Sequence, residues 1–268
     1  MPYRPLAAET GFVHVCAHRG HSIAAPENTL PALEAAAAHG ADACEIDVVL
    51  SADGEIIVIH DELLDRTTDG KGRVAAFDTQ ALARLDAGSW FDPRFAGTRL
   101  PTLTQALTTA RTHRLALLIE IKERQRPDRL IERLAVVLAE QRALDDVLVI
   151  SFDHPSLRRA QTRISGLRTE IITHARHVDP VAVAHNAGLK IRSGSANILF
   201  LRWDAKCTKS PPVKSTLKFP NFSLYASTKP SISLANPSTA PVSKLVVVSY
   251  PISGTLLSAF TKGSFAVK

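Results

Sequence analysis

Chemically active side chains gather where four apolar runs in the first half of the sequence end. Each run closes with two ionisable residues, and in two of the runs these residues are two positions apart. A spacing of two places both side chains on the same face of a β-strand. The candidates are His18 and Arg19, Glu45 and Asp47, His60 and Asp61, and Glu120 and Lys122.

The carboxylates and cations of this set predict a combined metal and anion site. Glu45, Asp47 and Glu120 offer only oxygen ligands, and converging carboxylates repel one another unless a cation neutralises them. Hard oxygen ligands suit Mg²⁺ or Ca²⁺ better than Zn²⁺. Arg19 and Lys122 add fixed positive charge, which together with a divalent ion would hold an anionic group such as a phosphate.

The two histidines supply groups that titrate near neutral pH. His18 and His60, placed on opposite sides of a phosphodiester, could act as general base and general acid. Each feature also has a structural interpretation, since a histidine at a strand end is often solvated and Glu120 with Lys122 could form a weak surface ion pair. We favour a site because the carboxylates interrupt otherwise apolar strands, where unpartnered charge is costly.

Strands and helices alternate from residue 12 to about residue 190. Strands are expected at 12–18, 43–50, 55–61, 115–122, 147–152 and 169–175. Helices are expected at 27–40, 100–113, 127–144, 154–164 and 179–188. This alternation predicts βαβ units and a parallel sheet. In a parallel α/β barrel the carboxyl ends of the strands meet at one mouth, which would bring the candidate residues together.

Two parts of this pattern differ from a simple repeat. The runs 43–50 and 55–61 are separated by the short turn SADG, which suggests a hairpin-like or closely spaced pair. The segment from about 62 to 100 breaks the alternation and is interpreted as an insertion. Within it, RTTDGKGRV at 66–74 lacks the strand-to-helix context of a phosphate-binding loop and is interpreted as a turn.

Other polar residues near the first strand are expected to be structural. Pro26 and Glu27 open the helix predicted at 27–40, where a carboxylate suits the positive end of the helix dipole. Gly20 would let the backbone turn at the barrel mouth. His21 is expected to be a bystander.

The composition argues against several classes of protein. The 268-residue chain is 45% hydrophobic, enough to bury a core, but has no apolar run of about 18 residues that would insert stably into a membrane. The N-terminal segment lacks the apolar stretch of a signal peptide, and the three cysteines show no C-x-x-C spacing. We therefore expect a cytoplasmic protein, and leave its oligomeric state open.

The composition changes abruptly near residue 190. Residues 1–190 hold 22 Lys and Arg against 25 Asp and Glu, whereas residues 191–268 hold 10 Lys and Arg against a single acid. The net charge of +6 therefore comes from the tail and does not indicate a nucleic-acid partner for the main domain. We predict a domain at 12–190, followed by an atypical, irregular Ser/Pro/Lys-rich tail at 191–268.

The ordered motifs of the main domain resemble those of the glycerophosphodiester phosphodiesterases. The resemblance covers about residues 12–190, and its elements come in the family's order and approximate spacing. They are H-R-G at 18–20, P-E-N-T at 26–29, E-x-D at 45–47, H-D at 60–61, R-T-T-x-G-x-G at 66–72 and E-x-K at 120–122.

The resemblance implies a TIM (β/α)8 barrel with a small insertion at about 62–100. It also implies divalent-metal-dependent hydrolysis of small glycerophosphodiesters to glycerol 3-phosphate and an alcohol. The attacking group, either water or the glycerol's own hydroxyl, stays open. Carried over by position, the roles are metal ligands for Glu45, Asp47 and Glu120, acid–base catalysis for His18 and His60, and phosphate contacts for Arg19 and Lys122.

The sequence departs from the family pattern after residue 190. The Trp-Thr-x-Asn strand and the final strand ending in Thr-Asp, which the family pattern calls for, are not recognisable. A frame change, a fusion or a divergent barrel end would explain this. In a divergent barrel end, the runs 198–203 and 244–250 would serve as the seventh and eighth strands. We expect the barrel to be incomplete after about residue 190.

Two alternative functions follow from these observations. The chain could be a C-terminally altered relative that is non-catalytic or misfolded, because a barrel without its last strands has open edges. It could also act on a phospholipid, as related phospholipase-D-like toxins do. The few cysteines and the lack of a signal peptide disfavour that second alternative.

Overall fold

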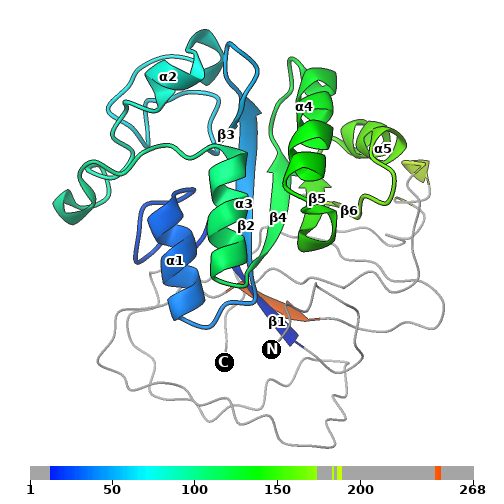
Figure 1. The fold of residues 1–268 in the computed structure, drawn as a ribbon, viewed down its shortest axis with the longest axis horizontal. Coiled ribbons are helices and arrows are strands. Elements are labelled where there is room, and N and C mark those ends of the chain that lie inside the picture. The colour runs from blue at the N-terminus through cyan, green and yellow to red at the C-terminus, as the bar shows by residue number, and fades with distance from the viewer. Residues whose placement is uncertain (1–12, 174–182, 184–185, 189–244, 249–268) are drawn as a thin grey trace, which may run out of the picture.

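The computed structural model describes residues 13–173, 183, 186–188 and 245–248. Its centre is a sheet in which five strands run parallel, in the order β6-β5-β4-β2-β1 (Figure 1). These strands are β1 (Val13–His18), β2 (Ala43–Leu50), β4 (Ala116–Ile121), β5 (Val147–Ser151) and β6 (Thr169–Ile171). The expected parallel α/β arrangement is confirmed, and these five parallel strands form the first part of a (β/α)8 barrel.

Helices cover one face of this sheet (Figure 1). The N-terminus of α3 is fixed by a capping box, in which Thr102 and Gln105 each satisfy a backbone amide of the other. A proline stands in the first turn of each of the other three helices, where its fixed φ favours helix initiation. The four helices are α1 (Leu30–Ala38), α3 (Leu103–Thr112), α4 (Pro127–Glu140) and α5 (His154–Arg163).

The central strands are buried on both faces, as parallel strands in a barrel must be. Every residue of β2 and β4 is buried. Their outward residues pack under the helices in the main core, whereas Ala43 of β2, Leu118 of β4 and Ile150 of β5 belong to a separate interior cluster. Because side chains alternate along a strand, residues two positions from Ala43 and Leu118 also face the barrel interior.

The chain reverses direction after β2. Strand β3 (Ile56–Val58) pairs antiparallel with β2, so that Val58 lies opposite Val48. This confirms a hairpin at 43–61, but it contradicts the expectation that His60 lies at a barrel strand's carboxyl end at the mouth. His60 reaches the other candidates because β3 runs back along β2.

The insertion after β3 packs around a small core of its own. Buried apolar residues from β2 and β3 meet residues from the insertion, including Leu64, Val74 and Leu82. The short helices of this region are η1 (Val74–Ala76), α2 (Thr79–Leu82) and η2 (Pro93–Phe95). A compact unit therefore sits beside the β2–β3 hairpin, next to the end of β2 that follows Asp47 (Figure 1).

One strand of the tail is described. Strand β7 (Leu245–Val248) pairs with the outer edge of β1 and runs antiparallel to it. All eight strands of a (β/α)8 barrel are parallel, so the suggestion that 244–250 replaces the eighth barrel strand is wrong. The run 198–203 and most of the helix predicted at 179–188 lie outside the described residues. Among the described helices, none is long and apolar enough to cross a membrane.

Candidate functional site

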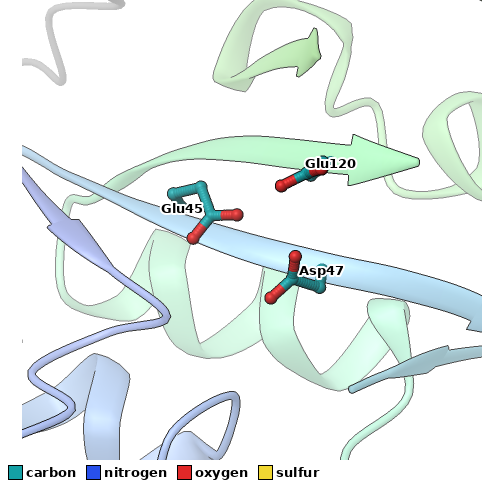
Figure 2. A group of neighbouring side chains, drawn as sticks. All are labelled: Glu45, Asp47 and Glu120. Atoms are coloured by element: carbon teal, nitrogen blue, oxygen red, sulfur yellow. The ribbon is translucent and has the colours of Figure 1, made fainter. Parts of the chain in front are cut away.

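Three carboxylates from two neighbouring strands meet inside the barrel. Glu45 and Asp47 project from β2, and Glu120 lies opposite Asp47 on β4 in the parallel register. One oxygen of each carboxylate lies within 4.8 Å of the others, and all three residues are buried. Figure 2 shows the carboxylates turned toward a common space between β2 and β4. This acidic triad, Glu45, Asp47 and Glu120, consists of the three residues that the sequence predicts as metal ligands, and it could hold a metal ion.

The triad holds more negative charge than the surrounding residues satisfy. The Oε1 atom of Glu45 is buried and accepts no hydrogen bond from the part of the chain that is described. Burial, followed by the nearby Asp47 carboxylate, raises the pKa of Glu45 well above its usual range and that of Glu120 to about 7. An oxygen-only cluster with an unsatisfied buried oxygen fits a hard divalent cation.

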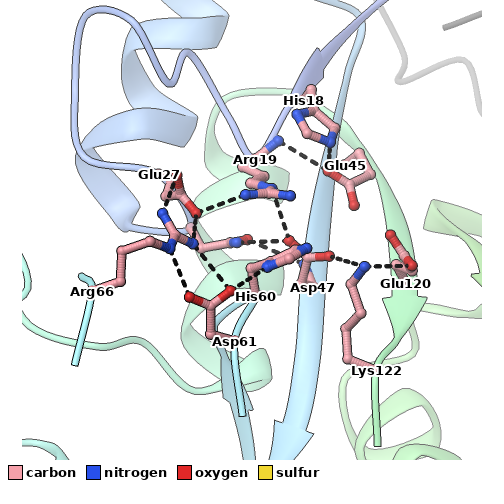
Figure 3. Close-up of polar contacts among 11 residues, drawn as sticks. His18, Arg19, Glu27, Glu45, Asp47, His60, Asp61, Arg66, Glu120 and Lys122 are labelled. Atoms are coloured by element: carbon pink, nitrogen blue, oxygen red, sulfur yellow. Dashed lines mark hydrogen bonds and ion pairs between the residues drawn. The ribbon is translucent and has the colours of Figure 1, made fainter. Parts of the chain in front are cut away.

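Two cations flank the triad at Asp47. Arg19 Nε lies 3.3 Å from Asp47 Oδ2, and Lys122 Nζ lies 3.4 Å from Asp47 Oδ1 and 2.7 Å from Glu120 Oε1 (Figure 3). Burial opposes ionisation of Asp47, but Arg19 and Lys122 outweigh it and lower its pKa. Asp47 is therefore the anionic centre of the triad, with both predicted phosphate-binding cations beside it.

Divalent ions are expected to stabilise the protein more strongly as the pH rises through about 7. The folded-state pKa values of Glu45 and Glu120 lie above those of an unfolded chain. Without metal, the stability that the protonated form of Glu120 contributes is therefore complete below about pH 4 and is lost as the pH rises through about 7. A bound cation offsets that loss. Thermal unfolding with chelator, Mg²⁺ or Ca²⁺ at about pH 5 and about pH 8 measures the effect, and an equal shift at both values would contradict it.

A strained turn after β1 aims Arg19 at the triad. Arg19 has a φ of 57°, in the left-handed region that non-glycine residues seldom adopt, and its backbone N–H donates to Glu45 Oε2 at 3.0 Å. The next residue, Gly20, has a φ of 73°, and a Cβ there would lie 2.7 Å from the backbone of Ala32. Glycine is therefore required at this turn for both conformation and space.

Asn28 fixes the position of Asp47 and was missed by sequence reasoning. Its Nδ2 donates to Asp47 Oδ2 at 2.8 Å, and its Oδ1 accepts from the backbone N–H of Asp47 at 3.1 Å. Asn28 is buried and has a φ of 58°, a conformation that asparagine tolerates better than most residues. Asn28 of the P-E-N-T motif thus orients Asp47, a candidate metal ligand, through these two hydrogen bonds.

Replacing Asn28 by glycine is expected to lower the free energy of unfolding by about 1–3 kcal/mol. It should also weaken metal binding by about tenfold, because an outer partner of a ligand is lost. Glycine keeps the left-handed backbone, so the effect isolates the side chain, whereas alanine would add backbone strain. Urea denaturation and metal titration check this, and unchanged values in both would show that Asn28 does not support Asp47.

The two histidines stand beside the triad on separate segments. His18, at the end of β1, lies opposite Glu45 of β2, and its Nε2 is 3.8 Å from Glu45 Oε2. His60 follows β3. The pairing with β2 continues beyond β3, because the N–H of Ile59 donates to the carbonyl of Asp47 at 3.0 Å. The antiparallel return of β3 therefore brings His60 to the level of the triad.

Asp61 fixes the tautomer of His60. His60 Nδ1 lies 2.5 Å from Asp61 Oδ1 (Figure 3). Burial opposes ionisation of Asp61, but hydrogen bonds from Arg66 and His60 outweigh it and lower its pKa to about 2. As a carboxylate, Asp61 only accepts, so Nδ1 carries the proton and Nε2 remains for proton transfer. Burial lowers the pKa of His60, although the nearby Asp47 carboxylate opposes this shift. The lowered pKa favours the neutral ring.

Glu27 does not open the first helix, contrary to expectation. Helix α1 begins at Leu30, after Thr29 has closed the preceding turn by donating from Oγ1 to the carbonyl of Pro26. The left-handed backbone of Asn28 interrupts the helical pattern there. Glu27 instead accepts a hydrogen bond from Arg19 Nη1 at 2.9 Å and pairs with Arg66 Nη2 at 2.7 Å. It belongs to the polar network of the site.

The structure thus brings all seven sequence-predicted site residues into one region and adds four others. The added residues came from motifs that were noticed but interpreted as structural, or from a strand end to which no role was assigned. The predicted set is His18, Arg19, Glu45, Asp47, His60, Glu120 and Lys122, and the added set is Glu27, Asn28, Asp61 and Arg66.

Comparisons with known proteins agree on one family. A family model described as the glycerophosphoryl diester phosphodiesterase family matches residues 18–197. A glycerophosphodiester phosphodiesterase of Caldanaerobacter subterraneus is 38% identical over 62% of this chain and 69% of its own length. A Bacillus subtilis protein of the same name is 33% identical over 60% of each chain. Human glycerophosphodiester phosphodiesterase 1 is 36% identical, but the match spans only 34% of its length.

Solved structures show the same likeness. An Oleispira antarctica phosphodiesterase, determined in complex with the product sn-glycerol 3-phosphate, aligns with a TM-score of 0.63 and 32% identity over 65% of this chain and 72% of that one. A glycerophosphodiester phosphodiesterase of Agrobacterium tumefaciens aligns with a TM-score of 0.54 and 31% identity over 67% of this chain and 85% of that one.

Proposed function

The chain belongs to the glycerophosphoryl diester phosphodiesterase family, and we propose that it hydrolyses small glycerophosphodiesters to glycerol 3-phosphate and an alcohol with the help of a divalent metal ion. The observation that carries the proposal is the buried acidic triad with two cations and two histidines around it (Figure 3). The Oleispira antarctica relative bound to sn-glycerol 3-phosphate supports the choice of product.

The triad is the proposed place of the metal ion. Glu45, Asp47 and Glu120 would hold Mg²⁺ or Ca²⁺ through carboxylate oxygens, as their chemistry favours. A divalent ion bound there supplies positive charge that stabilises negative charge developing on the phosphate oxygens. Arg19 and Lys122 extend the positive region, and we assign them to the phosphate.

The histidines provide the proposed proton transfers. His60, with Nδ1 held by Asp61 and a lowered pKa, can accept through Nε2 the proton of the attacking hydroxyl. His18, at the far side of Glu45, can donate a proton to the alcohol oxygen as its bond to phosphorus breaks. The attacking hydroxyl belongs either to water or to the glycerol itself. If the glycerol hydroxyl attacks, the alcohol leaves, a cyclic phosphate forms, and water then opens it to glycerol 3-phosphate.

A product assay tests the proposal. The purified chain is incubated with glycerophosphocholine and Mg²⁺ or Ca²⁺ and followed by phosphorus NMR, with choline measured separately. We expect glycerol 3-phosphate and choline in equal amounts, and a transient cyclic phosphate signal would identify attack by the glycerol hydroxyl. A cooperatively unfolding protein that shows no metal-dependent turnover would instead support the non-catalytic alternative.

Two further elements complete the proposal. We assign the substrates to small soluble diesters, because the chain resembles enzymes named for glycerophosphodiesters rather than for phospholipids. A cytoplasmic location is proposed from the three cysteines, which lack the spacing of a disulfide scaffold.

A further inference from the structure

We infer that Arg66 is a positioning residue that joins the two sides of the active site, holding His60 through Asp61 and Arg19 through Glu27. The inference rests on the proposed function. It adds to it a set of ion pairs, called the brace below, in which Arg66 of the insertion after β3 contacts both Asp61 and Glu27. Arg66 touches none of the triad carboxylates, and its action is exerted through its two carboxylate partners (Figure 3).

The guanidinium of Arg66 is shared between two carboxylates. Its Nε and Nη2 lie 2.6 and 3.3 Å from the two oxygens of Asp61. Its Nη1 and Nη2 lie 3.1 and 2.7 Å from the two oxygens of Glu27. Three nitrogens therefore make four contacts with two planar acceptors, a geometry that the arginine fork allows and a lysine ammonium does not.

One arm of the brace ends at His60. Asp61 Oδ1 accepts from both Arg66 Nη2 and His60 Nδ1, so the same oxygen is fixed by the guanidinium and by the imidazole. With both Asp61 oxygens held by Arg66, the carboxylate cannot turn away from the ring. The orientation of His60 Nε2 therefore depends on Arg66.

The other arm ends at Arg19. Glu27 Oε1 accepts from Arg66 Nη2 and from Arg19 Nη1, the latter at 2.9 Å, while Arg19 Nε faces Asp47 at 3.3 Å. Burial opposes ionisation of Glu27, but Arg66 and Arg19 outweigh it and lower its pKa. Because Glu27 precedes α1 and Arg66 follows β3, the contact ties together loops 39 residues apart in the sequence.

Arg66 is too exposed to act as a core residue that stabilises the fold. Its side chain is 43% exposed, whereas that of Glu27 is 14% exposed. A surface ion pair alone contributes little stability. Replacement of Arg66 should therefore change the geometry of the site far more than the stability of the fold.

The test compares the variants Arg66→Gln, Arg66→Lys and Glu27→Gln with Arg73→Gln as the matched control. Arg73 lies in the same insertion, and its exposed ion pair is with Glu62 rather than with Asp61 or Glu27. Two readouts are used on full-length protein: turnover of glycerophosphocholine with Mg²⁺, and the hydrogen-bonded Nδ1–H proton of His60 in histidine-labelled protein by NMR, assigned through its loss in His60→Ala.

The expected results differ between the two arms. Arg66→Gln and Arg66→Lys should lower kcat by about 10- to 100-fold and lose the His60 Nδ1–H signal, with near-normal thermal unfolding. Glu27→Gln should raise KM and keep the signal, because it loosens Arg19 while Arg66 keeps its Nε and Nη2 contacts with Asp61. Arg73→Gln should match the wild type in both readouts.

The outcomes separate this inference from the proposed function. A His60 signal that survives in Arg66→Gln overturns the brace, whatever the rate. If the wild-type chain fails to turn over the substrate but the signal is lost in Arg66→Gln and kept in Arg73→Gln, the brace stands and the proposed function fails. Wild-type turnover with an unchanged kcat in Arg66→Gln overturns the brace and leaves the function standing.

Discussion

Asp47→Asn is expected to reduce glycerophosphocholine turnover by about 1,000-fold or more. Asparagine keeps the shape of the side chain but removes the charge that Arg19 and Lys122 face at 3.3 and 3.4 Å. These two half-buried cations would then face a neutral group at this position, and the triad would lose its central carboxylate. Initial rates at saturating Mg²⁺ measure the effect.

Asp53→Asn is the matched control for this prediction. Asp53 lies on the turn that follows β2 and accepts hydrogen bonds from Ser51 and Thr79, away from the triad. It should keep wild-type turnover, which would show that loss of a carboxylate near β2 is not in itself harmful. Activity of folded Asp47→Asn within about tenfold of the wild type would contradict a ligand role for Asp47.

His60→Ala is expected to lower kcat by about 100- to 10,000-fold, the range that a positioned general acid or base contributes. Its Nδ1 is committed to Asp61 at 2.5 Å, so the substitution removes an oriented Nε2 beside Asp47 and not a free surface imidazole. Because the side chain is at the edge of the site, the fold should be retained. Steady-state kinetics with a circular-dichroism check of folding measure the effect.

His113→Ala provides the comparison for His60→Ala. His113 is exposed at the carboxyl end of α3, where it caps the helix through its backbone. Its replacement should leave kcat unchanged. If His60→Ala retained turnover equal to that of His113→Ala, proton transfer by His60 would be excluded.

The acidic triad could be predicted from sequence because it violates a simple rule. Strands buried on both faces are almost entirely apolar, so Glu45, Asp47 and Glu120 stand out in their strands. A period of two then places Glu45 and Asp47 on one face. Only the register, which sets Asp47 opposite Glu120, required the structure.

The second layer of the site could not be predicted by the same reasoning. Asn28 contributes through a left-handed backbone conformation, which helical or strand periodicity does not reveal. Glu27 looked like a helix-opening carboxylate, although Pro31 in the first turn of α1 indicates a start near Leu30. The contact of Glu27 with Arg66 spans 39 residues and depends on how the insertion folds back.

The β2–β3 reversal explains why His60 was placed correctly by a partly wrong argument. Convergence of parallel strand ends accounts for His18, Glu120 and Lys122, but His60 arrives through an antiparallel hairpin. The short SADG turn permitted this hairpin, yet a turn alone does not reveal how far the returning strand runs. The hydrogen bond from Ile59 to Asp47 shows that it returns to the triad.

Metal content and turnover, measured on the same samples, test the role of the triad most directly. The chelator-treated chain is titrated with Mg²⁺ or Ca²⁺, and bound metal and release of glycerol 3-phosphate are followed together in the wild type and in Glu45→Gln. We predict no turnover before metal is added, activity that rises in proportion to bound metal, and loss of both in Glu45→Gln. Full turnover by the metal-free wild type, or unchanged metal binding and rate in Glu45→Gln, would contradict a catalytic metal held by Glu45, Asp47 and Glu120.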